Sequence, residues 1–152
     1  MLYIKVSEGD KFPEFSLSDD SGNIVNNSSL TGNVNVVYFY PKDMTPGCTK
    51  EACDFKDNME KFKTAGISVY GISTDSIESH KKFKDKHGLN FSLLSDKDKV
   101  LVDKLGIKSI VGSAKRVTFL VDKNGSIIKI YPNVTPDGHA EEILNFISGI
   151  NK

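Results

Sequence analysis

Residues 34–53 read VNVVYFYPKDMTPGCTKEAC and join a strand pattern directly to the start of a helix. The first seven residues are mostly β-branched or aromatic and are apolar on both faces, which is typical of a central strand covered on both sides. Thr45 is a favourable N-cap, and Pro46 suits the first helical position. This junction predicts an open α/β sheet, in which ligands commonly bind beyond the end of such a strand.

Hydrophobic patterns on both sides of this junction predict further strands and helices. Towards the N-terminus, residues 15–17 and 24–25 predict a β-hairpin around a turn signal at 20–23. Towards the C-terminus we expect, in order, a helix after Thr45 that ends at Gly66, a strand at 67–72, a helix at 76–87, a strand at 91–94, a helix at 99–105, strands at 117–121 and 126–131, and a helix at 136–147. The sequence therefore predicts one α/β domain over residues 1–152, with a mixed central sheet flanked by helices.

Composition excludes several classes of function. The chain has 152 residues with 20 basic and 20 acidic side chains, so its formal net charge is zero and nucleic-acid binding is not expected. The apolar runs are too short to cross a bilayer, and no secretory signal is visible at the N-terminus. Two cysteines cannot form the framework of a disulfide-rich domain, so we expect a reduced, cytoplasmic setting. No histidine has metal-ligand spacing to a cysteine, and no metal site is expected.

Cys48 is the first candidate for chemistry. If Thr45 is the N-cap, Cys48 falls in the first turn of the helix, where free backbone N–H groups and the helix dipole favour a thiolate. Cysteines in such positions become nucleophiles. The Thr45 hydroxyl is close enough in sequence to hydrogen-bond the sulfur or an incoming substrate oxygen. The alternative for a single cysteine is a small buried hydrophobe, a description that suits Cys53 better than Cys48.

The spacing of the two cysteines predicts a conformational step. In an intact helix, five residues correspond to about 7.5 Å of rise and about 140° of rotation. A disulfide needs Cα atoms about 4.4–6.8 Å apart. Cys48 and Cys53 should therefore be unbonded in a helical segment, and pairing them would require local unwinding of residues 49–53.

Arg116 is the second candidate, because it is the single arginine among 20 basic residues. Its guanidinium group keeps its charge and offers a planar fork of donors, which could stabilise a thiolate or a substrate oxygen. It stands at the start of the predicted strand 117–121. A surface position or a structural ion pair explains it equally well from position alone.

Taken together, these residues resemble a known family. The pattern Pro41-x3-Thr45-x2-Cys48 is similar to the active-site signature of the peroxiredoxins. The longer stretch 38–53 resembles the bacterioferritin comigratory protein or peroxiredoxin Q subfamily, and the similarity covers essentially the whole chain. The resemblance implies a thioredoxin-like fold. It assigns six residues: Cys48 as the peroxidatic cysteine, Cys53 as the resolving cysteine, Thr45 as the peroxide-orienting hydroxyl, Pro41 as the shield of the pocket, Arg116 as the activating arginine, and Glu51 as the acidic residue after the nucleophile.

The resemblance also implies the activity. It predicts a peroxidase that reduces hydrogen peroxide and organic hydroperoxides through Cys48 sulfenic acid, forms a disulfide with Cys53, and is recycled by thioredoxin or a similar dithiol. No metal, haem or flavin is needed, and a monomer is expected. One alternative is a thioredoxin-like disulfide reductase, which expects C-x2-C where this chain has C-x4-C. Another is a non-catalytic redox-sensing module, in which Cys48 would be oxidised slowly and without turnover.

Overall fold

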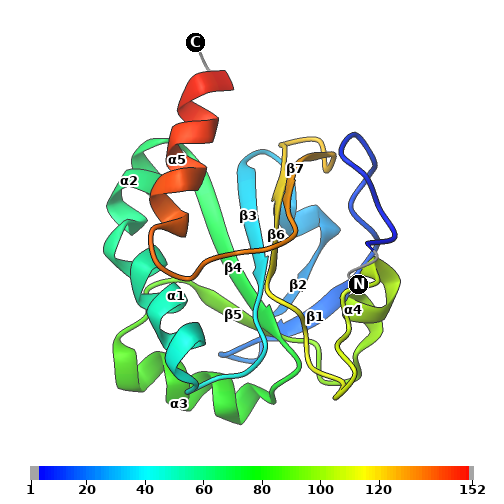
Figure 1. The fold of residues 1–152 in the computed structure, drawn as a ribbon, viewed down its shortest axis with the longest axis vertical. Coiled ribbons are helices and arrows are strands. Elements are labelled where there is room, and N and C mark those ends of the chain that lie inside the picture. The colour runs from blue at the N-terminus through cyan, green and yellow to red at the C-terminus, as the bar shows by residue number, and fades with distance from the viewer. Residues whose placement is uncertain (1–3, 151–152) are drawn as a thin grey trace.

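The computed structural model describes residues 4–150, which are built around a seven-stranded sheet. The strands lie in the order β2-β1-β5-β4-β3-β6-β7 (Figure 1). They are β1 (Ser16–Asp19), β2 (Ile24–Asn26), β3 (Val34–Phe39), β4 (Ile67–Ser73), β5 (Ser92–Ser95), β6 (Val117–Val121) and β7 (Ile127–Tyr131). The N-terminal hairpin is confirmed, since β1 and β2 pair antiparallel.

Five α-helices and one short 3-10 helix connect or cover these strands. They are α1 (Pro46–Asp57), α2 (Met59–Thr64), α3 (Ile77–His87), α4 (Val100–Leu105), α5 (His139–Ile150) and the 3-10 helix η1 (Asn27–Leu30). The 3-10 helix was not predicted from the sequence. Within residues 4–150, no helix is both long enough and apolar enough to cross a membrane.

The mixed strand directions follow from the connections. β3, β4 and β5 are parallel because helices carry the chain back between them, whereas β6 runs antiparallel to β3. In this register Phe39, the last residue of β3, lies opposite Val117, the first residue of β6. The start of β6 therefore lies beside the end of β3, where the chain leaves the sheet and enters the loop before α1.

Two hydrophobic cores, one on each face of the sheet, explain why β3 is apolar on both sides. Tyr38 and Tyr40 belong to the core that α1, α2, α3 and α5 cover. Val37 and Phe39 point to the opposite core, which includes the apolar residues of α4. Figure 1 shows α1, α2 and α5 on one side of the sheet and α4 on the other. The sequence interpretation of this strand is confirmed.

The long helix expected between Thr45 and Gly66 is wrong at one point, because the chain breaks at Asn58 and forms α1 and α2. The side chain of Asn58 donates from Nδ2 to the carbonyl of Asp54 at 2.8 Å. In a continuous α-helix the backbone N–H of residue 58 would use that same acceptor. The N–H of Asn58 donates instead to the carbonyl of Phe55 at 3.1 Å.

The last helix also begins later than expected, at His139 rather than at residue 136. Gly138 has a φ of +81°, a left-handed conformation outside the helical region. The three residues 136–138 therefore form the turn that leads into α5.

Candidate active site

Cys48 occupies the first turn of α1 and is 1% exposed. Thr45 is the N-cap and Pro46 is the first helical residue, as the sequence predicts. The backbone N–H groups of this turn have no acceptors within the helix, and the positive end of the helix dipole lies here. Both features place partial positive charge beside the Cys48 sulfur, and the thiolate is the nucleophilic form of cysteine.

Arg116 reaches this thiol from the residue immediately before β6. Its Nη2 lies 3.4 Å from Cys48 Sγ, and its Nη1 donates to Glu51 Oε1 at 2.6 Å. The guanidinium fork therefore contacts two residues of α1 at once, a geometry for which lysine has no equivalent. Of the readings that the sequence left open for Arg116, an isolated surface residue is excluded, and the structure shows both an ion pair and a contact with the thiol.

Glu51 lies on the same face of α1 as Cys48 and is fully buried. Burial raises the pKa of Glu51 to about 7, although the charge and the hydrogen bond of Arg116 act in the opposite direction. Its second oxygen, Oε2, has no hydrogen-bond partner among the residues that the structure describes. Glu51 can therefore bind or release a proton near neutral pH, beside the arginine that contacts the thiol.

Thr45 and Pro41 lie in the loop between β3 and α1. The Thr45 hydroxyl donates to the carbonyl of Lys42 at 2.8 Å, and it does not cap the first turn of α1. The sequence suggested the Cys48 sulfur or a substrate oxygen as the partner of this hydroxyl. Among the described residues, its acceptor is the carbonyl of Lys42 and not the sulfur. The oxygen lone pairs of Thr45 stay able to accept a hydrogen bond from a substrate O–H group. Pro41 is half-buried at the start of the loop.

Cys48 and Cys53 are both free thiols on an unbroken helix. Cys48 is buried and Cys53 is half-buried, as expected for residues separated by about 140° of helical rotation. A rise of about 7.5 Å between them exceeds the reach of a disulfide. The two sulfurs therefore cannot bond while α1 is intact, which agrees with the expectation from their spacing.

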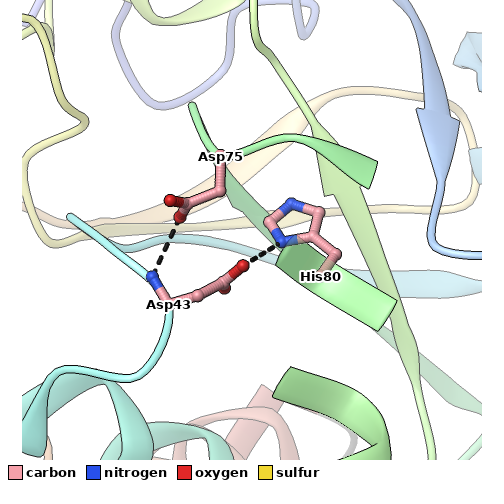
Figure 2. Close-up of side chains that lie close together, drawn as sticks. All are labelled: Asp43, Asp75 and His80. Atoms are coloured by element: carbon pink, nitrogen blue, oxygen red, sulfur yellow. Dashed lines mark hydrogen bonds and ion pairs between the residues drawn. The ribbon is translucent and has the colours of Figure 1, made fainter. Parts of the chain in front are cut away.

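A second cluster of polar residues, two of them buried and one half-buried, lies beside this site and was missed by the sequence analysis. Figure 2 shows Asp43, Asp75 and His80 close together, and one ligand atom from each lies within 4.8 Å of the others. The helical spacing of Ile77, His80 and Phe83, at i, i+3 and i+6, is the signal that could have placed this histidine on the inner face of α3. These residue types can bind a metal, but the hydrogen bonds described below occupy both nitrogens of His80 and both oxygens of Asp43.

A nucleophilic thiol at a helix start, contacted by an arginine from a neighbouring strand of a mixed sheet, defines a thiol-based redox protein. Comparison with known proteins specifies the family. The model of the AhpC/TSA family matches residues 8–130. The chain belongs to the AhpC/TSA family and is a peroxiredoxin of the Bcp and peroxiredoxin Q type, so it reduces peroxides by means of a thiol.

The relatives cover almost the whole chain. A protein of Coxiella burnetii named putative peroxiredoxin bcp is 42% identical over 148 residues, which is 93% of this chain and 98% of the relative. A chloroplastic peroxiredoxin Q of Suaeda salsa is 45% identical over 152 residues, covering 98% of this chain and 71% of the relative. Among solved structures, peroxidoxin BcpB of Mycobacterium tuberculosis superimposes with a TM-score of 0.90 at 33% identity, covering 97% of this chain and 99% of that chain. The thioredoxin-like fold that the resemblance implied is thereby confirmed.

Proposed function

We propose that Cys48 is the residue that attacks the peroxide. The observation that carries this proposal is the contact of 3.4 Å between Arg116 Nη2 and Cys48 Sγ at the start of α1. The Cys48 thiolate attacks one peroxide oxygen, the O–O bond breaks, and the sulfur is oxidised to sulfenic acid. The other oxygen leaves as hydroxide or alkoxide and takes up a proton to give water or an alcohol.

The neighbouring groups have separate roles in this step. Arg116 and the N–H groups of the first turn stabilise the charge that develops on the peroxide oxygens. The Thr45 hydroxyl accepts a hydrogen bond from the peroxide and so orients it. Pro41 shields the thiolate from water, and Glu51 fixes the guanidinium group of Arg116 through the 2.6 Å hydrogen bond.

Cys53 then resolves the sulfenic acid. Its thiolate attacks the Cys48 sulfur, the S–O bond breaks as the disulfide forms, and the sulfenic hydroxyl leaves as hydroxide, which takes up a proton to give water. This step requires that residues 49–53 leave the helix, because the intact helix holds the two sulfurs apart. The break at Asn58 separates α1 from α2, so the unwinding of residues 49–53 need not pass along a continuous helix into α2. An external dithiol such as thioredoxin reduces the disulfide; the cytoplasmic location and the monomeric state stay predictions.

Both hydrogen peroxide and organic hydroperoxides are proposed substrates. A surface hollow of about 420 Å³ is lined by Arg116, Lys115 and residues 132–135, beside the proposed peroxide site. It offers Pro132 and Val134 as apolar contacts for an alkyl group. A structural relative, the bacterioferritin comigratory protein of Xanthomonas campestris, has alkyl peroxide reduction activity.

The test is a titration of the reduced protein with less than one equivalent of hydrogen peroxide, followed by thiol counting and intact mass. We expect the loss of two thiols and the formation of one intramolecular disulfide for each peroxide consumed. Cys53→Ser should stop at Cys48 sulfenic acid, and Cys48→Ser should consume no peroxide. A sulfenic or sulfinic product in the unmodified chain, with Cys53 still free, would exclude the disulfide cycle. Oxidation as slow as that of an ordinary exposed thiol would favour the redox-sensing alternative.

A further inference from the structure

The loop of residues 41–45, which connects β3 to α1, is held by a buried carboxylate that the proposed chemistry does not use. Asp43 is 4% exposed, and three donors surround its side chain. The Tyr40 hydroxyl donates to Oδ1 at 2.6 Å, and the Ser79 hydroxyl donates to Oδ2 at 2.8 Å. His80 Nδ1 lies 2.7 Å from the same Oδ2. Asp43 therefore ties the loop to the end of β3 and to α3.

Both ring nitrogens of His80 have hydrogen-bond partners. The residue is fully buried, and Nε2 lies 2.8 Å from the carbonyl oxygen of Leu94, which can only accept, so Nε2 carries a proton. Nδ1 lies 2.7 Å from Asp43 Oδ2 and donates to it when the ring is doubly protonated. Burial lowers the pKa of His80, but the hydrogen bond and the charge of Asp43 outweigh burial, so that the pKa is raised. Asp43 and His80 thus form a buried hydrogen-bonded pair, which becomes a carboxylate–imidazolium pair when His80 is protonated (Figure 2).

The main chain of the loop is held by a third segment, the residues that follow β4. The backbone N–H of Asp43 donates to Asp75 Oδ2 at 2.9 Å, and the Ser73 hydroxyl donates to the same oxygen at 2.5 Å. Asp75 follows the end of β4. The side chain and the backbone of Asp43 are therefore fixed to separate elements, which leaves the loop little freedom to shift.

Met44, the residue after Asp43, has a backbone conformation that needs support from surrounding contacts. Met44 has a φ of +67°, a left-handed conformation that residues other than glycine rarely adopt unless surrounding contacts hold it. It stands between Asp43 and the N-cap Thr45. The conformation at Met44 sets the direction in which the chain enters α1, and hence the position of the Thr45 hydroxyl relative to Cys48.

We propose that Asp43 and His80 are positioning residues for peroxide reduction, which hold residues 41–45 so that Thr45 and the first turn of α1 face a peroxide at Cys48. The proposal rests on the function proposed above. Neither residue touches the sulfur or the peroxide in this account. Their effect is on the alignment of the peroxide, to which rates are sensitive when donors are displaced by about 1 Å.

Four variants test this proposal by removing the contacts one at a time. Tyr40→Phe and Ser79→Ala each delete one hydroxyl donor to Asp43. The first keeps the aromatic ring, and the second changes α3 by a single hydroxyl group. His80→Leu deletes the imidazole partner, and His80→Asn returns an amide donor near the position of Nδ1. For each protein we would measure the second-order rate of Cys48 oxidation by hydrogen peroxide and the rate of Cys48 alkylation by iodoacetamide.

Comparing the rates of oxidation and alkylation distinguishes a loss of peroxide alignment from a general disruption of the fold around Cys48. Alkylation needs the thiolate but not the groups that orient a peroxide. We expect His80→Leu to slow oxidation by about 10- to 100-fold, with smaller losses in Tyr40→Phe and Ser79→Ala and partial recovery in His80→Asn. Alkylation should stay at the rate of the unmodified chain in all four variants.

Two matched controls remove similar groups elsewhere. The Tyr131 hydroxyl is buried without a hydrogen-bond partner among the described residues, so Tyr131→Phe is the control for Tyr40→Phe. His139 is buried, and its nitrogens lie 2.9 Å from Thr118 Oγ1 and 2.8 Å from Glu142 Oε1, so His139→Asn is the control for His80→Asn. Both controls should keep the oxidation rate of the unmodified chain.

Two results would overturn the proposal while the proposed function stands. One is unchanged oxidation in Tyr40→Phe, Ser79→Ala and His80→Leu, provided that the unmodified chain reacts rapidly at Cys48. The other is a parallel change of oxidation and alkylation, which would mean that the cluster supports only the fold. Slow oxidation of the unmodified chain itself would instead overturn the proposed function, and with it the positioning role.

Discussion

Arg116 and Glu51 are 65 positions apart in the chain, yet Nη1 of the arginine lies 2.6 Å from Oε1 of the glutamate. Both side chains are withdrawn from solvent, the glutamate completely and the arginine for the most part. The same guanidinium group contacts Cys48 Sγ through Nη2. The protonation state of Glu51 and the position of Arg116 are therefore coupled to the reactive thiol.

Replacing Arg116 should slow the oxidation of Cys48 more than it affects the fold. Arg116→Met removes both donors, and we expect an oxidation rate about 100-fold lower, comparable to the loss of one donor from an oxyanion site. Arg116→Lys keeps the charge but cannot contact Glu51 and Cys48 at once, so its rate should be intermediate. Stopped-flow oxidation by hydrogen peroxide measures both.

Lys115→Met is the control for Arg116→Met, because it removes a neighbouring cation that is half-buried. Its oxidation rate should equal that of the unmodified chain. An equal loss in both variants would show that Arg116 acts only through the general positive potential at this edge of the sheet.

Glu51 should make the stability of the fold decrease as the pH rises. Burial raises the pKa of Glu51 to about 7 in the folded chain, from 4.5 for an exposed glutamate. Between pH 4.5 and about 7 the folded state holds more protons than the unfolded state. The free energy of unfolding should therefore fall with increasing pH, by about 3 kcal/mol in total.

Urea unfolding at a series of pH values from 4 to 8 tests this dependence. In Glu51→Gln the fall between about pH 4.5 and 7 should be absent, because the amide does not titrate. Glu60→Gln replaces an exposed glutamate in α2 and should keep the fall. A stability profile of Glu51→Gln that parallels the unmodified chain would contradict the assignment of this pH dependence to Glu51.

Gly47→Ala should separate activity from stability. A Cβ at this position would lie 3.1 Å from Arg116 Nη2, so the guanidinium group that contacts the sulfur must give way by a few tenths of an ångström. Gly47 lies within α1, where alanine is preferred over glycine by up to about 1 kcal/mol, and the variant should stay folded. We expect peroxide oxidation to slow by about tenfold or more, as when catalytic donors are misplaced.

Gly149→Ala supplies the comparison, since a Cβ there would meet no heavy atom within 4 Å and the residue also lies in a helix. It should oxidise at the rate of the unmodified chain. Thermal unfolding of both variants measures whether the fold is preserved, and a Gly47→Ala variant with full peroxide reactivity would show that Arg116 adjusts without loss.

Oxidation should loosen the start of α5 as well as α1. Asp54, next to Cys53, accepts a hydrogen bond from the Ala140 N–H at 2.9 Å through Oδ2. Drawing Cys53 towards Cys48 removes Asp54 from this contact. A hydrogen bond to a charged group contributes about 1.5–3 kcal/mol, so amide exchange at Ala140 should accelerate at least about tenfold in the disulfide form.

Hydrogen exchange of the reduced and oxidised proteins measures this effect. The last turns of α5, anchored by buried Ile147, should exchange equally in both forms. Peroxide-treated Cys53→Ser, which cannot form the disulfide, should retain slow exchange at Ala140. Unchanged exchange at Ala140 in the disulfide form would mean that Asp54 does not move with Cys53.

Most of the strand and helix pattern could be predicted because it depends on residues close in sequence. The apolar faces of β3 and the N-cap at Thr45 are examples. The break at Asn58 was missed because an amide that takes an i−4 carbonyl leaves no mark on hydrophobic periodicity. The late start of α5 depends on the conformation of Gly138, which the pattern also did not reveal.

By itself, the sequence determined that Cys48 stands at a helix start and that Cys53 lies on the opposite side of that helix. Both facts follow from helical geometry and capping within a few residues. Only the tertiary structure decided that Arg116 meets Glu51, 65 positions away, and that His80 meets Asp43, 37 positions away. Such contacts depend on the order and direction of the strands, which bring distant segments together at one end of the sheet. Local side-chain patterns do not specify that order.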